Sequence, residues 1–377
     1  MHEALTRMLG YLRVDSKNFP LLSDAADLAL QCGEWEIASE LVQRALDERP
    51  DDAVSRYRRV IVLLHERRHR EAVAMSGALL NEGNTQPALK FAHARALVMG
   101  EDYAPAESFL TLLMGDLARL EDYPTLPHLY IRTLHALGRT EEAIEVANRH
   151  LTAHPGDVLA KGMTSLLYFD QGDVDQANRF SEEALAHSPE NADALLAAGS
   201  VALAREQDDQ AKDHFNKLVS MQPDGGRAWL GLGMAEMRGN RMEEARESLQ
   251  KAIACMPHQL ATYNILAWLD IFRQDYAAAR TTLEQCLSQD RNFGETHGTL
   301  AVLAAIEDDW DEAAQRAETA VRLDAESFAG RYAQTLLLKY RGQTARSDQL
   351  LAAILKGADL PWGGTLFDAM QRFAARQ

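Results

Sequence analysis

The chain has 377 residues, of which 46% are hydrophobic and 25% are charged, as in an ordinary folded protein. Its formal net charge is −17 and its pI is near 5.2, which argues against DNA, RNA or an anionic membrane surface as the main partner, because those partners require a basic footprint. Three scattered cysteines, Cys32, Cys255 and Cys286, lack zinc or disulfide spacing, and no apolar run reaches the length of a membrane span or a signal peptide. We therefore expect a cytoplasmic protein without membrane insertion.

A repeated pattern of 34 residues organises the chain. Residues 1–18 hold a short amphipathic segment, which we expect to be an N-terminal capping helix. The repeat is clearest where Pro189, Pro223 and Pro257 each follow an alanine by twelve residues, and a fixed period of this length indicates an array of one supersecondary unit. In chain order the expected units are 19–52, 53–86, 87–120, 124–157, 158–191, 192–225, 226–259, 260–293, 294–327 and 328–361.

Each unit is predicted to be helix, turn, helix, because apolar residues recur at helical spacing on both sides of a turn signal. In the unit that starts at residue 158, Gly172 suits a left-handed helix stop, and Asp173 or Asp175 can cap the next helix. Pro189 ends the second helix and Asn191 can cap the following one. Residues 87–120 are the least regular unit, and a short insertion at 121–123 follows them.

The pattern resembles the tetratricopeptide repeat family. The 226–259 unit carries the family's large, small, alanine and proline positions at Trp229, Leu232, Gly233, Ala245, Leu249, Ala252 and Pro257. The resemblance covers nearly the whole chain. It implies an all-α, right-handed superhelical solenoid of about ten helix–turn–helix units with helical caps at both ends.

Four segments follow from this reading. Residues 1–18 form the N-terminal cap, and residues 19–123 form less regular repeats. Residues 124–327 form regular repeats, and residues 328–377 form a degenerate unit with a C-terminal capping helix at 365–376. Terminal caps are expected because the end repeats of a solenoid would otherwise expose a core face.

No pattern of catalytic residues is apparent, so we predict that the protein is not an enzyme and has no cofactor, metal site or catalytic residue. His65 and His69 stand at a suggestive i,i+4 spacing, but a solvated polar segment is the favoured interpretation. Acidic pairs such as Glu141 and Glu142 are read as favourable charge at helix N-termini. The basic run of residues 67–70 could bind an acidic group, although such a run at a turn is usually solvated.

The family resemblance places the partner-binding surface on the concave face, lined by the first helix of each unit. At those positions the second half of the chain is unusually apolar, and large apolar patches usually mark interaction sites. An adaptable methionine surface would suit an amphipathic partner helix. The candidate contact residues are Phe169, Leu196, Leu203, Leu230, Met234, Met237, Asn264, Trp268, Phe272 and Tyr332.

Three functions are compatible with this surface. The favoured one is a scaffold or adaptor whose concave groove binds a peptide or amphipathic helix of a protein partner of unknown identity. The alternatives are a self-assembling homo-oligomer and a peptide-responsive regulatory sensor. A tightly wound superhelix or the C-terminal helix could also cover the apolar positions.

Overall fold

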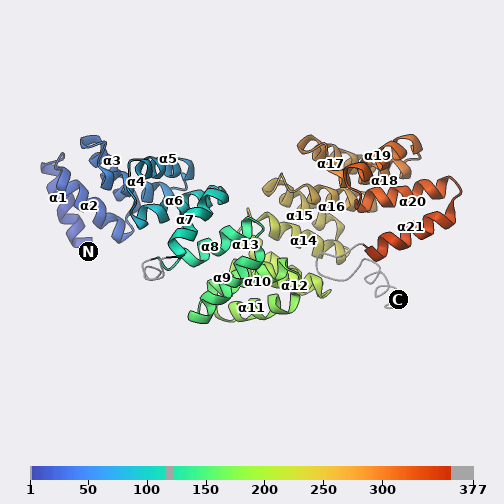
Figure 1. The fold of residues 1–377 in the computed structure, drawn as a ribbon, viewed down its shortest axis with the longest axis horizontal. Helices are drawn as coiled ribbons and strands as arrows, with labels where there is room; N and C mark the ends of the chain where they lie inside the picture. Colours follow the sequence, from blue (N-terminus) through green and yellow to red (C-terminus); the bar gives the residue numbers. More distant parts are fainter. Residues whose placement is uncertain (1, 116–122, 358–377) are drawn as a thin grey trace. The chain divides into compact units, whose positions relative to one another are not determined.

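The computed structural model describes residues 2–115 and 123–357, and every regular element within them is an α-helix. The chain divides into two compact units, residues 1–155 and 156–377. In each unit, antiparallel helical pairs pack side by side, which confirms the predicted all-α solenoid (Figure 1). The expected C-terminal cap at 365–376 and part of the 121–123 insertion lie outside the described residues.

In the first unit, residues 2–115 and 123–155 form a leading helix and four pairs. The leading helix α1 lies within the segment predicted to be an N-terminal cap and packs against α2 through Leu5 and Leu12. The helices are α1 (His2–Val14), α2 (Phe19–Cys32), α3 (Trp35–Glu48), α4 (Ala53–His65), α5 (His69–Asn81), α6 (Pro87–Met99), α7 (Tyr103–Met114), α8 (Leu126–Ala136) and α9 (Thr140–Ala153).

The described part of the second unit, residues 156–357, consists of six pairs, and their first helices begin at the first residue of each predicted repeat. The helices are α10 (Val158–Asp170), α11 (Val174–His187), α12 (Ala192–Ala204), α13 (Asp208–Met221), α14 (Gly226–Arg238), α15 (Met242–Cys255), α16 (Leu260–Phe272), α17 (Tyr276–Gln289), α18 (Gly294–Ile306), α19 (Trp310–Leu323), α20 (Phe328–Tyr340) and α21 (Thr344–Gly357).

The turn within each pair adopts one backbone conformation whether or not glycine is present. Gly172 has φ 89°, as predicted for a left-handed stop, and the Asp173 carboxylate then accepts a hydrogen bond from the amide of Gln176 at 3.0 Å. Glu206 and Gln274 occupy the same left-handed position with φ 60° and 62°. Packing of the pair therefore imposes the turn, since non-glycine residues adopt this region at a cost of ~1 kcal/mol.

Small residues let the helices approach each other. The repeated alanines are fully buried, including Ala177, Ala211 and Ala245. Phe215 fills the space between α12 and α14, where a Cβ at Gly199 or Gly231 would lie 2.7 Å or 2.4 Å from its ring. Glycine is thus required at these two positions by the aromatic ring.

A hydrogen bond also joins the end of one repeat to the first helix of the next. The Trp229 indole nitrogen donates to the Pro223 carbonyl at 2.7 Å, and the Tyr263 hydroxyl donates to the Pro257 carbonyl at 3.0 Å. In these two repeats, the large residue at the fourth position thus uses its polar tip as well as its apolar bulk.

Candidate partner-binding face

All ten predicted contact residues lie in the second unit, on the first helices of its pairs. Phe272 is the most exposed of them, with 65% of its surface accessible to solvent. Leu203 and Asn264 are buried, with only 5% and 4% exposed. The remaining seven are half-buried: Phe169, Leu196, Leu230, Met234, Met237, Trp268 and Tyr332.

The half-buried residues owe their burial to contacts between neighbouring repeats. Leu196 and Met234 pack against the core cluster around Phe215. Leu230 and Met237 pack against a second cluster, which contains Leu249, Leu266 and two further buried residues. These side chains therefore contribute to stacking, and only their remaining surface is open to a partner.

Asn264 joins two first helices. Its amide nitrogen donates to the Thr296 hydroxyl at 3.0 Å, and its amide oxygen accepts from the Thr299 hydroxyl at 3.0 Å. Both threonines lie on α18 and are fully buried. A buried amide satisfied on both sides fixes the packing of α16 against α18.

An aromatic patch, made of Trp268, Phe272, Phe328 and Tyr332, lies on α16 and α20. The Trp268 ring centroid is 6.0 Å from that of Phe272 and 6.3 Å from that of Tyr332. The Phe328 and Tyr332 rings are parallel, with centroids 6.3 Å apart. These distances fall within the range in which aromatic pairs attract each other.

The helix between α16 and α20 explains how these rings meet. Residues 296–305 of α18 are all buried, and a Cβ added at Gly298 would lie 2.2 Å from the Gly330 nitrogen of α20. Such close backbone packing brings Trp268 and Tyr332 together over α18, where Val302 and Ala305 underlie them in one cluster. By contrast, α14 and α16 make little contact with each other.

A polar contact spans α12 in the same way. The Arg227 guanidinium of α14 lies 3.0 Å from the Asp170 carboxylate of α10. Here too, a helix rich in alanine separates the two partners. The inner face of the second unit is therefore bridged at α12 and at α18.

The two polar patterns noted in the sequence do not form a shared site. His65 stacks on Trp35 with ring centroids 4.0 Å apart, which places its ring in an aromatic contact. Within the basic run, Arg68 forms ion pairs with Glu71 and Glu66 at 2.6 Å and 3.0 Å. The hydrogen bonds that the Arg68 guanidinium donates to the Glu71 carboxylate, followed by the one it donates to Glu66, raise the pKa of Arg68. The run is thus partly neutralised by its own neighbours.

Comparison with known proteins identifies the repeats. One family model of the tetratricopeptide repeat matches residues 23–79 and 197–259, and a second such model matches residues 168–224. The matched stretches, residues 23–79 and 168–259, therefore consist of tetratricopeptide repeats. Such repeats support a protein-interaction scaffold in general terms. No curated protein matches the chain.

Two solved structures share the fold over most of their length. The APC/C hetero-tetramer Cut9–Hcn1 is 14% identical, with 93% of this chain and 83% of that chain covered and a TM-score of 0.54. The human IFIT1 dimer with PPP-AAAA is 13% identical, with 90% of each chain covered and a TM-score of 0.56. At these identities the likeness shows the fold of this chain and nothing about its ligands.

Among the described residues, no helix is both long and apolar enough to cross a membrane. The compartment, the absence of catalysis, the exclusion of nucleic acid and the oligomeric state stay predictions.

Proposed function

We propose that this repeat protein is a scaffold whose second unit binds an apolar or amphipathic segment of a partner protein, in helical form, along α14, α16 and the aromatic patch. The observation that carries the proposal is the Phe272 ring, 65% exposed beside the half-buried Trp268 and Tyr332. Aromatic residues are enriched at the cores of protein interfaces, and Trp and Tyr are frequent among binding hot spots.

The remaining candidates have different parts in this proposal. Met234 and Met237 on α14 offer flexible, polarisable side chains that can adjust to a partner's shape. Leu203 and Asn264 are buried, so they support the surface and do not contact the partner. Burying the exposed part of the Phe272 ring would contribute ~1–2 kcal/mol, a large share of the energy of a peptide contact.

The proposal predicts that Phe272→Glu lowers binding of the partner by at least about tenfold, or 1.4 kcal/mol. A photo-crosslinking amino acid at position 272 would first identify the partner in the source cell. Affinity of the purified pair would then be measured for the wild type and for Phe272→Glu. Leu112→Glu is the matched control, because Leu112 is 67% exposed and lies on α7 of the first unit.

Three results would count against groove binding. They are unchanged affinity of Phe272→Glu with native circular dichroism, equal loss in the Leu112→Glu control, and a crosslink from position 272 to a second copy of the chain. The last of these would support the self-assembly alternative.

A further inference from the structure

Three successive first helices of the first unit are basic in an otherwise acidic chain. Helices α4, α6 and α8 contain no aspartate or glutamate, although 56 of the 377 residues in the chain are acidic. The same helices carry six arginine or lysine residues and four histidines. Because α6 packs directly against both α4 and α8, the three helices form one continuous layer on the inner face of this unit.

Two arginines of this layer face solvent. The three arginines of α4 already form ion pairs with neighbouring carboxylates. Arg95 is the only exposed residue of α6, and its guanidinium forms no hydrogen bond or ion pair within the part of the chain that the structure describes. Arg132 occupies the same repeat position on α8 and is exposed as well. The inner face therefore presents guanidinium groups from two neighbouring helices.

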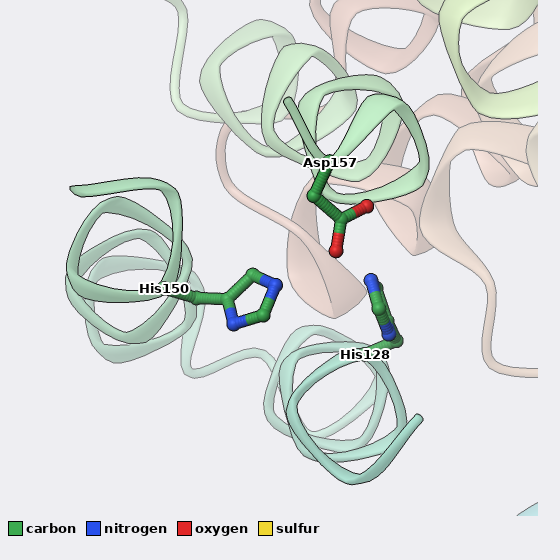
Figure 2. A group of neighbouring side chains, drawn as sticks. All are labelled: His128, His150 and Asp157. Carbon is green, nitrogen blue, oxygen red and sulfur yellow. The ribbon is translucent and has the colours of Figure 1, made fainter. Parts of the chain in front are cut away.

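A ring stands one helical turn before each of these two arginines, at Phe91 and at His128, and residues four apart share one side of a helix. The Phe91 ring centroid lies 5.0 Å from that of Tyr123, and both residues are half-buried. The His128 and His150 rings meet at 73° with centroids 5.3 Å apart (Figure 2). Each guanidinium is thus accompanied by a ring that a neighbouring ring holds in place.

We propose that this face of α4, α6 and α8 binds an acidic segment of a protein partner, whose carboxylates pair with Arg95 and Arg132 and whose apolar side chains pack beside Phe91. A guanidinium and a carboxylate match each other through two parallel hydrogen bonds. Helices in contact have axes ~8–10 Å apart, so the segment needs two carboxylates at about that separation. Glutamates seven residues apart on a helix, ~10 Å along its axis, meet this requirement.

The acidic segment is a second kind of ligand, chemically different from the apolar segment proposed for the second unit. A nucleic acid fits the basic face less well, because it is held through many phosphate contacts. The two exposed arginines supply few such contacts, and the net charge of −17 repels a long polyanion. A short acidic segment can reach the two guanidinium groups without following the rest of the acidic surface.

The test is fluorescence anisotropy of the full chain with a labelled helical peptide that carries phenylalanine and has glutamates recurring every seven residues. We expect the wild type to bind it at least about tenfold more tightly than a matched peptide with glutamine in place of glutamate. Arg95→Glu should weaken binding of the acidic peptide by at least about tenfold, because it replaces an attraction with a repulsion. Arg95→Gln should weaken it less, and both variants should keep native circular dichroism.

Arg70→Glu is the matched control. Arg70 is also exposed and without a partner in the described residues, but it lies on α5, the second helix of its pair, so binding should equal that of the wild type. Phe272→Glu should leave this peptide bound too, which separates the basic face from the site proposed on the second unit.

Four results would overturn the proposal. They are no binding of the acidic peptide, equal affinity for the two peptides, an equal loss in Arg70→Glu, and tighter binding of a single-stranded RNA that Arg95→Glu abolishes. Light scattering adds a fifth: a wild-type dimer that Arg95→Glu dissociates would assign the face to a second copy of the chain.

Discussion

Within each unit, the first helices of successive repeats are held together on the inner face, but by different kinds of contact. In the first unit, Arg58 of α4 reaches α2, where its guanidinium lies 3.3 Å from the Asp27 carboxylate and donates to the Ser23 hydroxyl at 2.7 Å. In the second unit, the corresponding region around α18 is closed by backbone packing at Gly298 and by rings above it. One repeat geometry therefore accommodates both polar bridges and close apolar contact.

The two kinds of contact differ in how large a substitution they tolerate. An exposed ion pair contributes only ~0–1 kcal/mol and can be lost without moving a helix. Two helices whose backbones are in direct contact tolerate no such change, because an added methyl group must displace the neighbouring helix. We infer that the packing around α18 in the second unit is more rigid than the packing around α4 in the first unit. This rigidity holds the aromatic patch in place.

The largest predicted effect is that of Gly298→Ala. The new Cβ would lie 2.2 Å from the Gly330 nitrogen and 2.7 Å from the Ala329 carbonyl carbon, so α20 must shift. We expect a loss of about 2–3 kcal/mol in the free energy of unfolding, as for overpacked cores. Chemical denaturation would measure the loss in the free energy of unfolding.

Gly77→Ala in the first unit is the control. A Cβ there would lie 3.6 Å from the His93 ring, an ordinary contact. Since Gly77 lies within α5, alanine should stabilise the helix by ~0.5–1 kcal/mol. Equal effects at both glycines would mean that the two units pack alike.

The arrangement of helices was predictable because one period fixes it. Residues 158, 192 and 226 were expected to begin repeats, and α10, α12 and α14 begin there. The caps followed from local chemistry, as Asn191 shows by accepting from the Ala194 amide at 3.0 Å. Where the period is interrupted, precision falls: α8 begins at Leu126, two residues after the expected start of its repeat.

The burial of the candidate residues was not predictable from the period. Asn264 is buried only because α16 and α18 approach closely enough for Thr296 and Thr299 to reach its amide. That distance depends on how successive repeats stack, and residue spacing along one helix does not predict it.

A smaller loss in the free energy of unfolding is predicted when a carboxylate is removed from an ion pair, and the loss should be larger where the carboxylate is buried. The Asp270 side chain is fully buried and lies 3.0 Å from Arg246 and 3.1 Å from Arg273. Asp270→Asn should cost about 2 kcal/mol, in the range for hydrogen bonds to charged groups. The Asp27 side chain is 50% exposed, so Asp27→Asn in the first unit should cost no more than ~1 kcal/mol.

Urea denaturation of the two variants would test this ordering. A larger loss in Asp27→Asn would show that the polar bridge matters more to the first unit than its exposure suggests. Equal losses in the free energy of unfolding would indicate that the Asp270 carboxylate is as accessible to water as that of Asp27.

The smallest predicted effect is an opposite response of the two units to mild acid. Burial lowers the pKa of His93 in the first unit, where its Nδ1 lies 2.7 Å from the Ser76 hydroxyl. The unfolded histidine therefore binds protons more readily than the folded one, and stability contributed by the neutral ring is lost as the pH falls below about 6.5. Peptides of α6 should exchange amide hydrogens faster at pH 5.5 than at pH 7, after correction for intrinsic rates.

Glu295 of α18 should behave in the reverse way. Burial raises the pKa of its carboxyl, although hydrogen bonds from the Ser327 hydroxyl and the Ala329 amide oppose the shift. The folded state then binds its proton at a higher pH than the unfolded state does, so acidification towards pH 4.5 should stabilise the packing of α18 against α20. His93→Gln and Glu295→Gln should each flatten the pH dependence of their own unit alone. If acid weakens both regions equally, titration of these two groups does not distinguish the units, and the contrast between them lies in packing only.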